Sequence, residues 1–320
     1  MAVYTEVSDD QLAALLAGYD IGAPVSFKGI AEGIENSNYF LQTTTGRYIL
    51  TLFEKRVDPA GLPFFMGLMD HLSARGIPCP VPLKGNGAWV NEVAGRPCAI
   101  VTFLEGLSPR RPRRDHCTAL GGALAALHLA SANFAAQRPN DFSLETWRAL
   151  FAATEAETQK TWPALTETVA AELDFLESAW PEDLPAGVIH GDLFPDNVMF
   201  TGLAVSGIID FYFACTDLYA YEIAICLNAW CFEPDGDFNV TKARGLLTAY
   251  RAVRPFTEAE MAALPLLARG ASLRFLLTRL QDWFHGADGA LGRKKDPLEY
   301  WHKLRFHQAA KSAADYGITK

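Results

Sequence analysis

The chain has 320 residues, of which half are hydrophobic and a fifth charged, a composition typical of globular proteins and unlike that of disordered chains. Its 28 Lys and Arg against 37 Asp and Glu give a formal charge of −9, which argues against a nucleic-acid partner because phosphate contacts need a clustered positive surface. With no secretory signal, no apolar segment resembling a membrane span and only six scattered cysteines, the sequence predicts a cytoplasmic protein with reduced core thiols and no membrane partner.

The first third of the chain predicts a small antiparallel sheet with one packed helix. Runs rich in β-forming residues are joined by short turns into two hairpins. These runs are 38–42, 47–53, 88–93 and 97–104. A helix is expected over 63–74, with Pro63 at its start and Gly76 just past its end. Residues 1–103 are therefore expected to form a small lobe of α+β type.

Helical patterns dominate the remainder, residues 104–320, after a boundary expected near residues 102–108. The apolar periodicity predicts helices over 117–135, 144–158, 165–179, 217–229, 240–250, 258–267 and 271–284. A β-rich island, 188–210, interrupts them. The predicted fold is thus α+β and bilobal, with a second lobe that is mainly helical.

The β-rich island places polar side chains where apolar runs begin or end. Its first run ends in His190-Gly191-Asp192, the next begins after Asn197, and the last ends at Asp210. The turn at Thr201-Gly202 allows the last two runs to pair as a hairpin. We expect this pairing to bring Asn197 and Asp210 to one end, beside the loop that contains Asp192.

These residue types suit phosphoryl transfer. Two carboxylates and an amide oxygen are hard ligands for Mg²⁺, and a carboxylate near the acceptor hydroxyl can act as a base. Asp192 suits the role of base, and Asn197 and Asp210 suit the metal. Taken singly, each residue is more often a turn or cap residue, but the joint pattern favours a site. His190 is expected to be a core histidine that holds loop carbonyls.

The island resembles the signature of the aminoglycoside phosphotransferase and choline kinase superfamily. The resemblance rests on His190-Gly191-Asp192-Leu193, Asn197 and Ile209-Asp210-Phe211, with Leu127-His128 also matching. It implies small-molecule kinases with a bilobal, protein-kinase-like fold. By this resemblance Asp192 is the catalytic base, and Asn197 and Asp210 bind the metal.

Further segments resemble the bacterial homoserine kinase branch of that superfamily. They are 1–22, 27–30, 33–39, 48–54 and 228–232, so that the resemblance covers nearly the whole chain. It implies that ATP, with Mg²⁺, phosphorylates the hydroxyl of L-homoserine, a step toward threonine.

The nucleotide is expected between the lobes. A glycine-containing loop that includes Gly33, together with the hydroxyl of Ser37, would cover the phosphates. The backbone of Thr102, Phe103 and Leu104 would meet the adenine edge.

One part of the family pattern is missing. Thr51 stands where Tyr-x-Leu-Lys has its phosphate-binding lysine, and Phe65 and Gly67 stand where that lysine's glutamate is expected. Other residues must then hold the phosphates, with Thr51 in the nucleotide site. The candidate cations are Lys28, Arg47, Lys55 and Arg56.

The substrate is a zwitterion, so its site needs a cation for the carboxylate. Arg274 and Arg279 lie in an apolar helical stretch and are the candidates, with an internal salt bridge to Asp282 or Glu222 as the alternative. Tyr212 and Asp217 follow the metal-binding segment closely and are further candidates. Asp217 is also a candidate helix N-cap.

Two other functions remain compatible with the sequence. The acceptor could be choline, methylthioribose or an aminoglycoside, in which case Arg274 would have no carboxylate to bind. Alternatively, the loss of the lysine could mark a nucleotide-binding pseudokinase without turnover. The sequence leaves the oligomeric state open.

Overall fold

The computed structural model describes residues 4–30, 36–54, 58–286 and 294–319. They form two compact units. The first contains the described residues up to Gly106 together with Ser206–Tyr212. The second contains the other described residues.

The first unit is built on a five-stranded antiparallel sheet in the order β1-β2-β3-β5-β4. Its strands are β1 (Pro24–Gly29), β2 (Ser37–Thr43), β3 (Arg47–Leu52), β4 (Asn91–Val93) and β5 (Arg96–Thr102). Both predicted hairpins are confirmed, as is the helix α2 (Leu62–Ser73). The sequence analysis did not predict β1 or α1 (Asp9–Leu16), although α1 begins with a capping box between Ser8 and Gln11.

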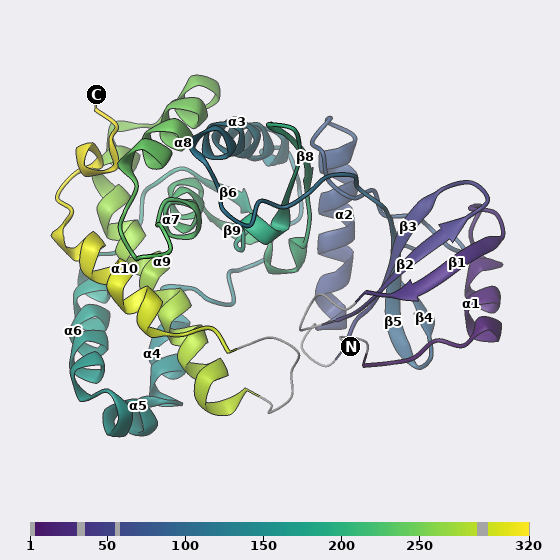
Figure 1. Cartoon of the computed structure of the whole chain (residues 1–320), viewed down its shortest axis with the longest axis horizontal. Coiled ribbons are helices and arrows are strands. Elements are labelled where there is room, and N and C mark those ends of the chain that lie inside the picture. The colour runs from purple at the N-terminus through teal and green to yellow at the C-terminus, as the bar shows by residue number, and fades with distance from the viewer. Residues whose placement is uncertain (1–3, 31–35, 55–57, 287–293, 320) are drawn as a thin grey trace. The chain divides into compact units, whose positions relative to one another are not determined.

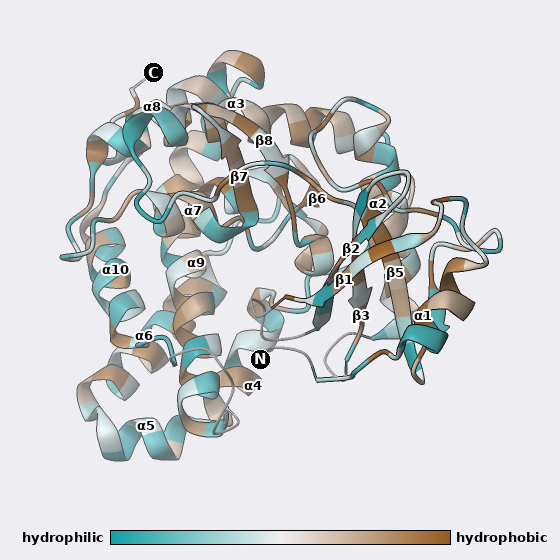
Figure 2. Ribbon diagram, turned by 45° about the vertical axis from the view of Figure 1, so that its right-hand side comes forward, coloured by the Kyte–Doolittle hydropathy of each residue, from teal (hydrophilic) through white to brown (hydrophobic). Residues whose placement is uncertain are grey.

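A hydrophobic core fills the space between this sheet and α1. Leu12 and Leu16 of α1 pack with Leu41 and Leu50 of β2 and β3. Apolar residues also run along β5, which is coloured mostly brown in Figure 2. The buried face of the sheet thereby fixes the register of β2 and β3, which positions Thr51 opposite Asn38.

The second unit is mainly helical. Its helices are α3 (Arg114–Ser131), α4 (Leu144–Ala152), α5 (Glu155–Thr161), α6 (Pro163–Ala179), α7 (Tyr219–Trp230), α8 (Val240–Val253), α9 (Glu258–His285) and α10 (Leu298–Ala309). Figure 1 shows α3 packed beside α8 and α10 packed beside α9. Every residue of α7 except Ala229 is buried, so this helix forms the centre of the unit. The sequence analysis did not predict α10.

Two predicted helix boundaries are wrong. The helix expected over 144–158 is two helices, because the backbone leaves the helical conformation at Thr154. The helices expected over 258–267 and 271–284 are one, α9, which continues through Gly270. Gly270 lies against Trp180, whose ring would stand 2.3 Å from an added Cβ. Gly270 is therefore a packing residue and not a helix stop.

Among the described helices, α9 alone is long and apolar enough to span a membrane by length and composition. Its most apolar window is 67% buried inside the unit, as expected for a core helix. The six cysteines are buried free thiols, as predicted.

Two pairs of short strands frame the β-rich island. β6 (Ala186–Ile189) pairs with β9 (Cys215–Leu218), with Ile189 opposite Cys215 and Gly187 opposite Asp217. β7 (Val198–Thr201) and β8 (Ala204–Ile208) form a two-stranded sheet, which confirms the predicted hairpin. Asp217 lies inside β9, and α7 begins at Tyr219 with Leu218 at its N-cap. α7 confirms the helix expected over 217–229, but its expected start and the cap role of Asp217 were wrong.

Candidate active site

The loop that follows β6 carries the central carboxylate. Gly191 adopts φ = 76°, a left-handed conformation that a glycine reaches without steric cost. The fully buried His190 accepts a hydrogen bond from the amide of Asp192 through Nδ1 at 3.3 Å. His190 is thus the predicted core histidine, and it holds a loop amide; its expected contact with loop carbonyls stays a prediction.

Asn197 holds Asp192 from the following turn. Its Nδ2 donates to the backbone oxygen of Asp192 at 2.8 Å and to Oδ2 of the same residue at 3.2 Å. Asn197 closes the 3₁₀ turn Pro195–Asn197, whose proline fixes the backbone entry. The two residues are therefore in direct contact, and Asn197 lies beside the loop that contains Asp192, as expected.

Arg274 of α9 approaches the other oxygen of Asp192. Its Nη1 lies 3.9 Å from Oδ1 of Asp192, and its side chain is only 6% exposed. The guanidinium lies over the rings of Phe275 at 3.9 Å and Phe142 at 4.9 Å. Nη1 is buried and has no hydrogen-bond partner among the described residues. A buried donor without a partner is rare and suits a ligand that carries an anionic group.

Burial and charge act on Asp192 in opposite directions. Burial raises the pKa of its carboxyl above the ordinary value, and the positive charge of Arg274 opposes that rise. A carboxylate with a raised pKa is a stronger proton acceptor than an ordinary aspartate. This arrangement suits a general base.

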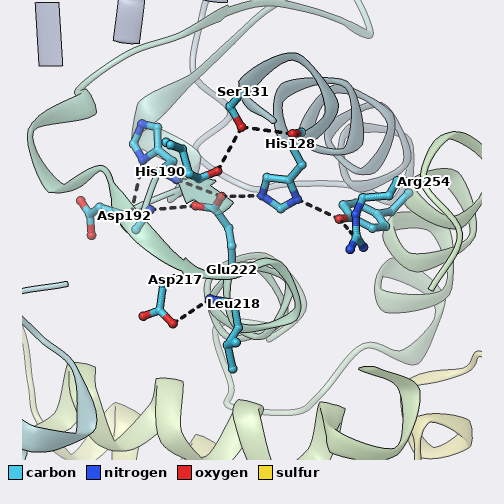
Figure 3. Close-up of polar contacts among 11 residues, drawn as sticks. His128, Ser131, His190, Asp192, Asp217, Leu218, Glu222 and Arg254 are labelled. Carbon is cyan, nitrogen blue, oxygen red and sulfur yellow. Dashed lines mark hydrogen bonds and ion pairs between the residues drawn. The ribbon is translucent and has the colours of Figure 1, made fainter. Parts of the chain in front are cut away.

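Glu222 connects the loop to the core of the unit (Figure 3). From the buried helix α7 its Oε2 accepts the amide of His190 at 2.9 Å, and its Oε1 accepts the amide of Gly191 at 2.8 Å. His128 of α3 also contacts Oε2, through Nε2 at 2.9 Å. One carboxylate thus fixes two successive loop amides just before Asp192.

The protonation states of this cluster follow from its contacts. Burial lowers the pKa of His128, which is therefore neutral. Burial raises the pKa of Glu222, but the hydrogen bonds that it accepts from His128 and from the loop amide outweigh this effect, so that its pKa is lowered. An ionised Glu222 needs a donor at Nε2 of His128, which leaves Nδ1 to accept the hydroxyl hydrogen of Tyr250 at 2.8 Å. Tyr250 in turn accepts from Arg254 at 3.2 Å.

The described structure places the remaining metal candidate, Asp210, in the first unit. Asp210 adopts φ = 65°, which is uncommon for a residue with a side chain. Tyr212, two residues later, packs edge-on against Phe53 and Phe65. Burial and the charge of Asp210 raise the pKa of Tyr212, so that its hydroxyl stays protonated. The convergence of Asp210 with Asp192 and Asn197 stays a prediction.

The residues of the first unit that were expected to contact the nucleotide differ in their hydrogen bonds within the fold. Ser37 is fully buried, and its hydroxyl donates to Glu54 at 2.7 Å while it accepts two backbone amides. Thr102 exchanges hydrogen bonds with Val81 through its amide and its hydroxyl. The amide of Phe103 donates to Arg47 at 3.0 Å. Ser37, Thr102 and the Phe103 amide are therefore engaged within the fold.

Leu104 is different, because its amide donates to no other described residue. Arg47 is paired with Glu105 and lies over Phe103, whereas Lys28 is exposed on β1. Gly33, Lys55 and Arg56 lie outside the described residues.

Two substrate candidates have other partners in the second unit. Arg279 donates to Glu299 at 2.6 Å and to the backbone oxygen of Asp296 at 3.0 Å, and so forms an internal salt bridge. Asp217 accepts from Asn140 at 2.7 Å and lines a cavity of about 300 Å³ between α4, α6 and α7. Neither Asp192 nor Arg274 lines that cavity.

Sequence reasoning missed the partners that hold the loop. Glu222 stands alone as an acid in the apolar run of α7, which is a signal of a buried, satisfied carboxylate. Tyr250 and Arg254 lie on α8 and its end, and no local pattern links them to His190.

Comparisons with known proteins identify the family of this chain. A family model described as the phosphotransferase enzyme family matches residues 26–256. Homoserine kinases from Xanthobacter autotrophicus and Azorhizobium caulinodans are 61% and 60% identical over 319 residues, covering 99% of this chain and of theirs.

Solved structures show the same fold. The structure of an amicoumacin kinase with AMP-PNP and Ca²⁺ has a TM-score of 0.69 at 16% identity, covering 94% of this chain and 92% of that one. A spectinomycin phosphotransferase in complex with ADP has a TM-score of 0.67 at 14% identity and covers 97% of each chain. The α+β fold of protein-kinase-like phosphotransferases, predicted from the sequence, is therefore confirmed.

Proposed function

Because the chain belongs to the homoserine kinases of the phosphotransferase enzyme family, we propose that Asp192 is its catalytic base. The enzyme transfers the terminal phosphoryl group of ATP to the side-chain hydroxyl of L-homoserine. The observation that carries the assignment of the base is the environment of Asp192, which Asn197 orients from one side and Arg274 faces from the other.

The two oxygens of Asp192 have different tasks. Oδ2 is held by Asn197, which leaves Oδ1 to accept the proton of the substrate hydroxyl. As the hydroxyl oxygen of the substrate forms its bond to phosphorus, the bond from phosphorus to the leaving ADP oxygen breaks. The proton of the hydroxyl moves to Oδ1 of Asp192. Arg274 favours the ionised carboxylate that this step requires.

Arg274 also suits the carboxylate of the substrate. Its unpartnered Nη1 lies beside Asp192, so that a short amino acid could place its hydroxyl on one group and its carboxylate on the other. Arg279 is excluded from this role by its pairing with Glu299. Tyr212 and Asp217 receive no substrate contact in this proposal.

Asn197 and Asp210 are the residues that would hold Mg²⁺. The amide nitrogen of Asn197 is fixed on Asp192, which leaves its hard oxygen Oδ1 as the metal-binding atom, and Asp210 supplies carboxylate oxygens. The metal supplies neutralisation of the phosphate charge. The backbone amide of Leu104, which donates to no other described residue, is the group that we assign to the adenine edge. The enzyme is expected in the cytoplasm.

The test is ADP release from MgATP against L-homoserine, L-serine, choline, methylthioribose and 3-aminopropan-1-ol. We expect a strong preference for L-homoserine. Asp192→Asn should retain AMP-PNP binding and lower kcat by roughly 10²–10⁴-fold. A preference for another acceptor would refute the substrate assignment, and an active Asp192→Asn variant would refute the assignment of the base.

A further inference from the structure

The place of the missing lysine supplies no positive charge. Thr51 on β3 is 4% exposed, and its Oγ1 donates to Oδ1 of Asn38 at 2.8 Å, so that a neutral hydroxyl engaged within the sheet stands there. The phosphoryl group passes to its acceptor with negative charge on its outer oxygens, and kinases stabilise that charge with cations. A cation for the phosphoryl group must therefore come from another position.

Lys295 lies beside the catalytic loop of the second unit. Its Nζ is 5.6 Å from the centre of the Phe194 ring. The amide of Phe194 donates to the backbone oxygen of Asp192 at 2.8 Å, so that this ring leaves the tight turn directly after the proposed base. Phe194 meets Phe275 edge-on at 4.8 Å, and the guanidinium of Arg274 lies 3.9 Å from the centre of the Phe275 ring. Two adjoining rings thus carry one cation each, beside the loop that contains Asp192.

The chain around Lys295 is attached to α9 on both sides. Nζ of Lys294 donates to the backbone oxygen of Trp283 at 3.0 Å, and the backbone oxygen of Asp296 accepts from Arg279 at 3.0 Å. Lys295 itself is exposed and has no hydrogen-bond or ion-pair partner among the described residues. An ammonium with unused donors on an anchored segment suits an anionic ligand.

The two cations near Asp192 differ in burial and therefore in task. Arg274 is buried and is assigned to the carboxylate of the substrate. Lys295 is exposed, and its compact ammonium on a flexible stem suits a group that arrives from solvent with the nucleotide. Its charge also acts on Asp192, where burial raises the pKa of the carboxyl and the charges of Arg274 and Lys295 oppose that rise. Since phosphorus bonds to the same hydroxyl oxygen whose proton Asp192 accepts, the phosphoryl oxygens come within reach of a cation placed here.

We propose that Lys295 is a catalytic residue that binds an outer oxygen of the terminal phosphoryl group while this group passes from ATP to the hydroxyl of the substrate. The ammonium donates a hydrogen bond and keeps its protons, so that Asp192 still accepts the hydroxyl proton. Lys295 thereby supplies, from the second unit, the charge that Thr51 does not. The proposal rests on the proposed function, in which the phosphoryl group is transferred beside Asp192.

Two measurements test this contact in Lys295→Met, which removes the charge and keeps most of the side chain. The first is kcat for L-homoserine on the alkaline plateau of the pH profile, where Asp192 is ionised in every variant. We expect kcat to fall by about 10²-fold, as for the loss of one donor to a charge that develops in the transition state. The second is nucleotide affinity by isothermal titration calorimetry with Mg²⁺. The affinity for AMP-PNP should fall by about 5–10-fold, whereas the affinity for ADP, which lacks the terminal group, should stay within about twofold.

Lys295→Arg and Lys311→Met are the matched variants. Lys295→Arg keeps the charge and should retain kcat within about tenfold of the unaltered enzyme. Lys311 is also exposed in the second unit, and its backbone amide donates to Asp315 of the 3₁₀ turn Ala313–Tyr316, so that Lys311→Met removes the same charge at a different place. It should leave kcat and both affinities unchanged, and urea unfolding of all variants verifies that the fold is retained.

Three results would overturn the proposal. They are an unchanged kcat in Lys295→Met, equal weakening of ADP and AMP-PNP binding in that variant, and an equal loss of kcat in Lys311→Met. A raised KM for L-homoserine with unchanged kcat belongs to the first of these, and it would assign Lys295 to the substrate carboxylate instead.

Asp192→Asn separates this inference from the proposed function. If Asp192→Asn loses activity while Lys295→Met keeps it, Asp192 remains the base and the role of Lys295 is refuted. If Asp192→Asn stays active, the assignment of the base is refuted, and the difference between AMP-PNP and ADP binding still decides whether Lys295 contacts the terminal phosphoryl group.

Discussion

Replacing Arg274 by methionine should shift the pH dependence of the enzyme, because Arg274 is the main charge that opposes the effect of burial on Asp192. Two unit charges at 3.9 Å interact by about 1 kcal/mol in bulk water and about 4 kcal/mol at an effective dielectric constant near 20. Since about 1.4 kcal/mol corresponds to one pKa unit, the limits are roughly 0.7 and 3 units. Asp192 retains 24% exposure of its side chain, so solvent screens the pair and a shift of about 1–2 units is expected.

The sign of the shift is fixed by the chemistry. Removing the positive charge raises the pKa of Asp192, so the base is protonated at higher pH and the acidic limb of kcat/KM for L-homoserine moves upward. The assay is the pH profile of kcat/KM at saturating MgATP, which reports the ionisations of the enzyme before homoserine binds. Arg274→Lys, which keeps the charge, is the matched variant and should keep the limb near its original place.

A second readout separates the two tasks of Arg274. With 3-aminopropan-1-ol, which has no carboxylate, Arg274→Met should lose activity only through the pKa of the base. An acidic limb that stays in place while kcat/KM for L-homoserine falls would show that Arg274 acts only on the substrate. The electrostatic reasoning would then be refuted.

Two other substitutions test the support of the site, and a third tests an ion pair elsewhere in the second unit. Glu222→Gln should lower the free energy of unfolding by about 2–3 kcal/mol, because a loop amide loses a charged acceptor. Urea titration measures this free energy, and an unchanged midpoint would contradict the role of Glu222. Gly191→Ala should lower kcat more than 10-fold, because the added Cβ would lie 2.7 Å from the carbonyl oxygen of Phe213 and the residue has a positive φ. Steady-state kinetics and a melting curve measure the effect, and an unchanged kcat would contradict this prediction. Burial raises the pKa of Glu299, but the charges of Lys303 and Arg279 lower that pKa to about 2. The stability that this ion pair contributes is therefore present above about pH 4.3 and is lost as the pH falls toward 2. Glu299→Gln should flatten that part of the stability curve, and an identical slope would exclude the ion pair as its cause.

Local patterns predicted the site better than its surroundings. The turn at Gly191, the hairpin of β7 and β8 and the place of Asn197 depend on neighbouring residues, which a sequence displays directly. Gly270 was misread because its reason is tertiary, the contact with Trp180. Asp217 was misread as a cap because the pairing of β9 with β6, and not helix capping, determines its conformation.

The support of the catalytic loop could not be read from the sequence. Glu222 meets His128 across 94 positions of the chain, and His128 meets Tyr250 across 122. Such pairs arise from the packing of α3 against α7 and α8, which no local periodicity encodes. The composition of α7 still marked Glu222 as exceptional, so a buried acid in an apolar helix is the signal to look for.

The two amides bound to Glu222 have a consequence for the motions of this enzyme. Because that carboxylate belongs to the fully buried helix α7, the His190 and Gly191 amides can exchange their hydrogens with solvent only when the centre of the unit opens. They should rank among the slowest-exchanging amides of the chain, whereas most functional loops are among the fastest. The proposed base would then follow directly after protected backbone, and a change of acceptor would be easier through the side chains that face this loop than through the loop itself.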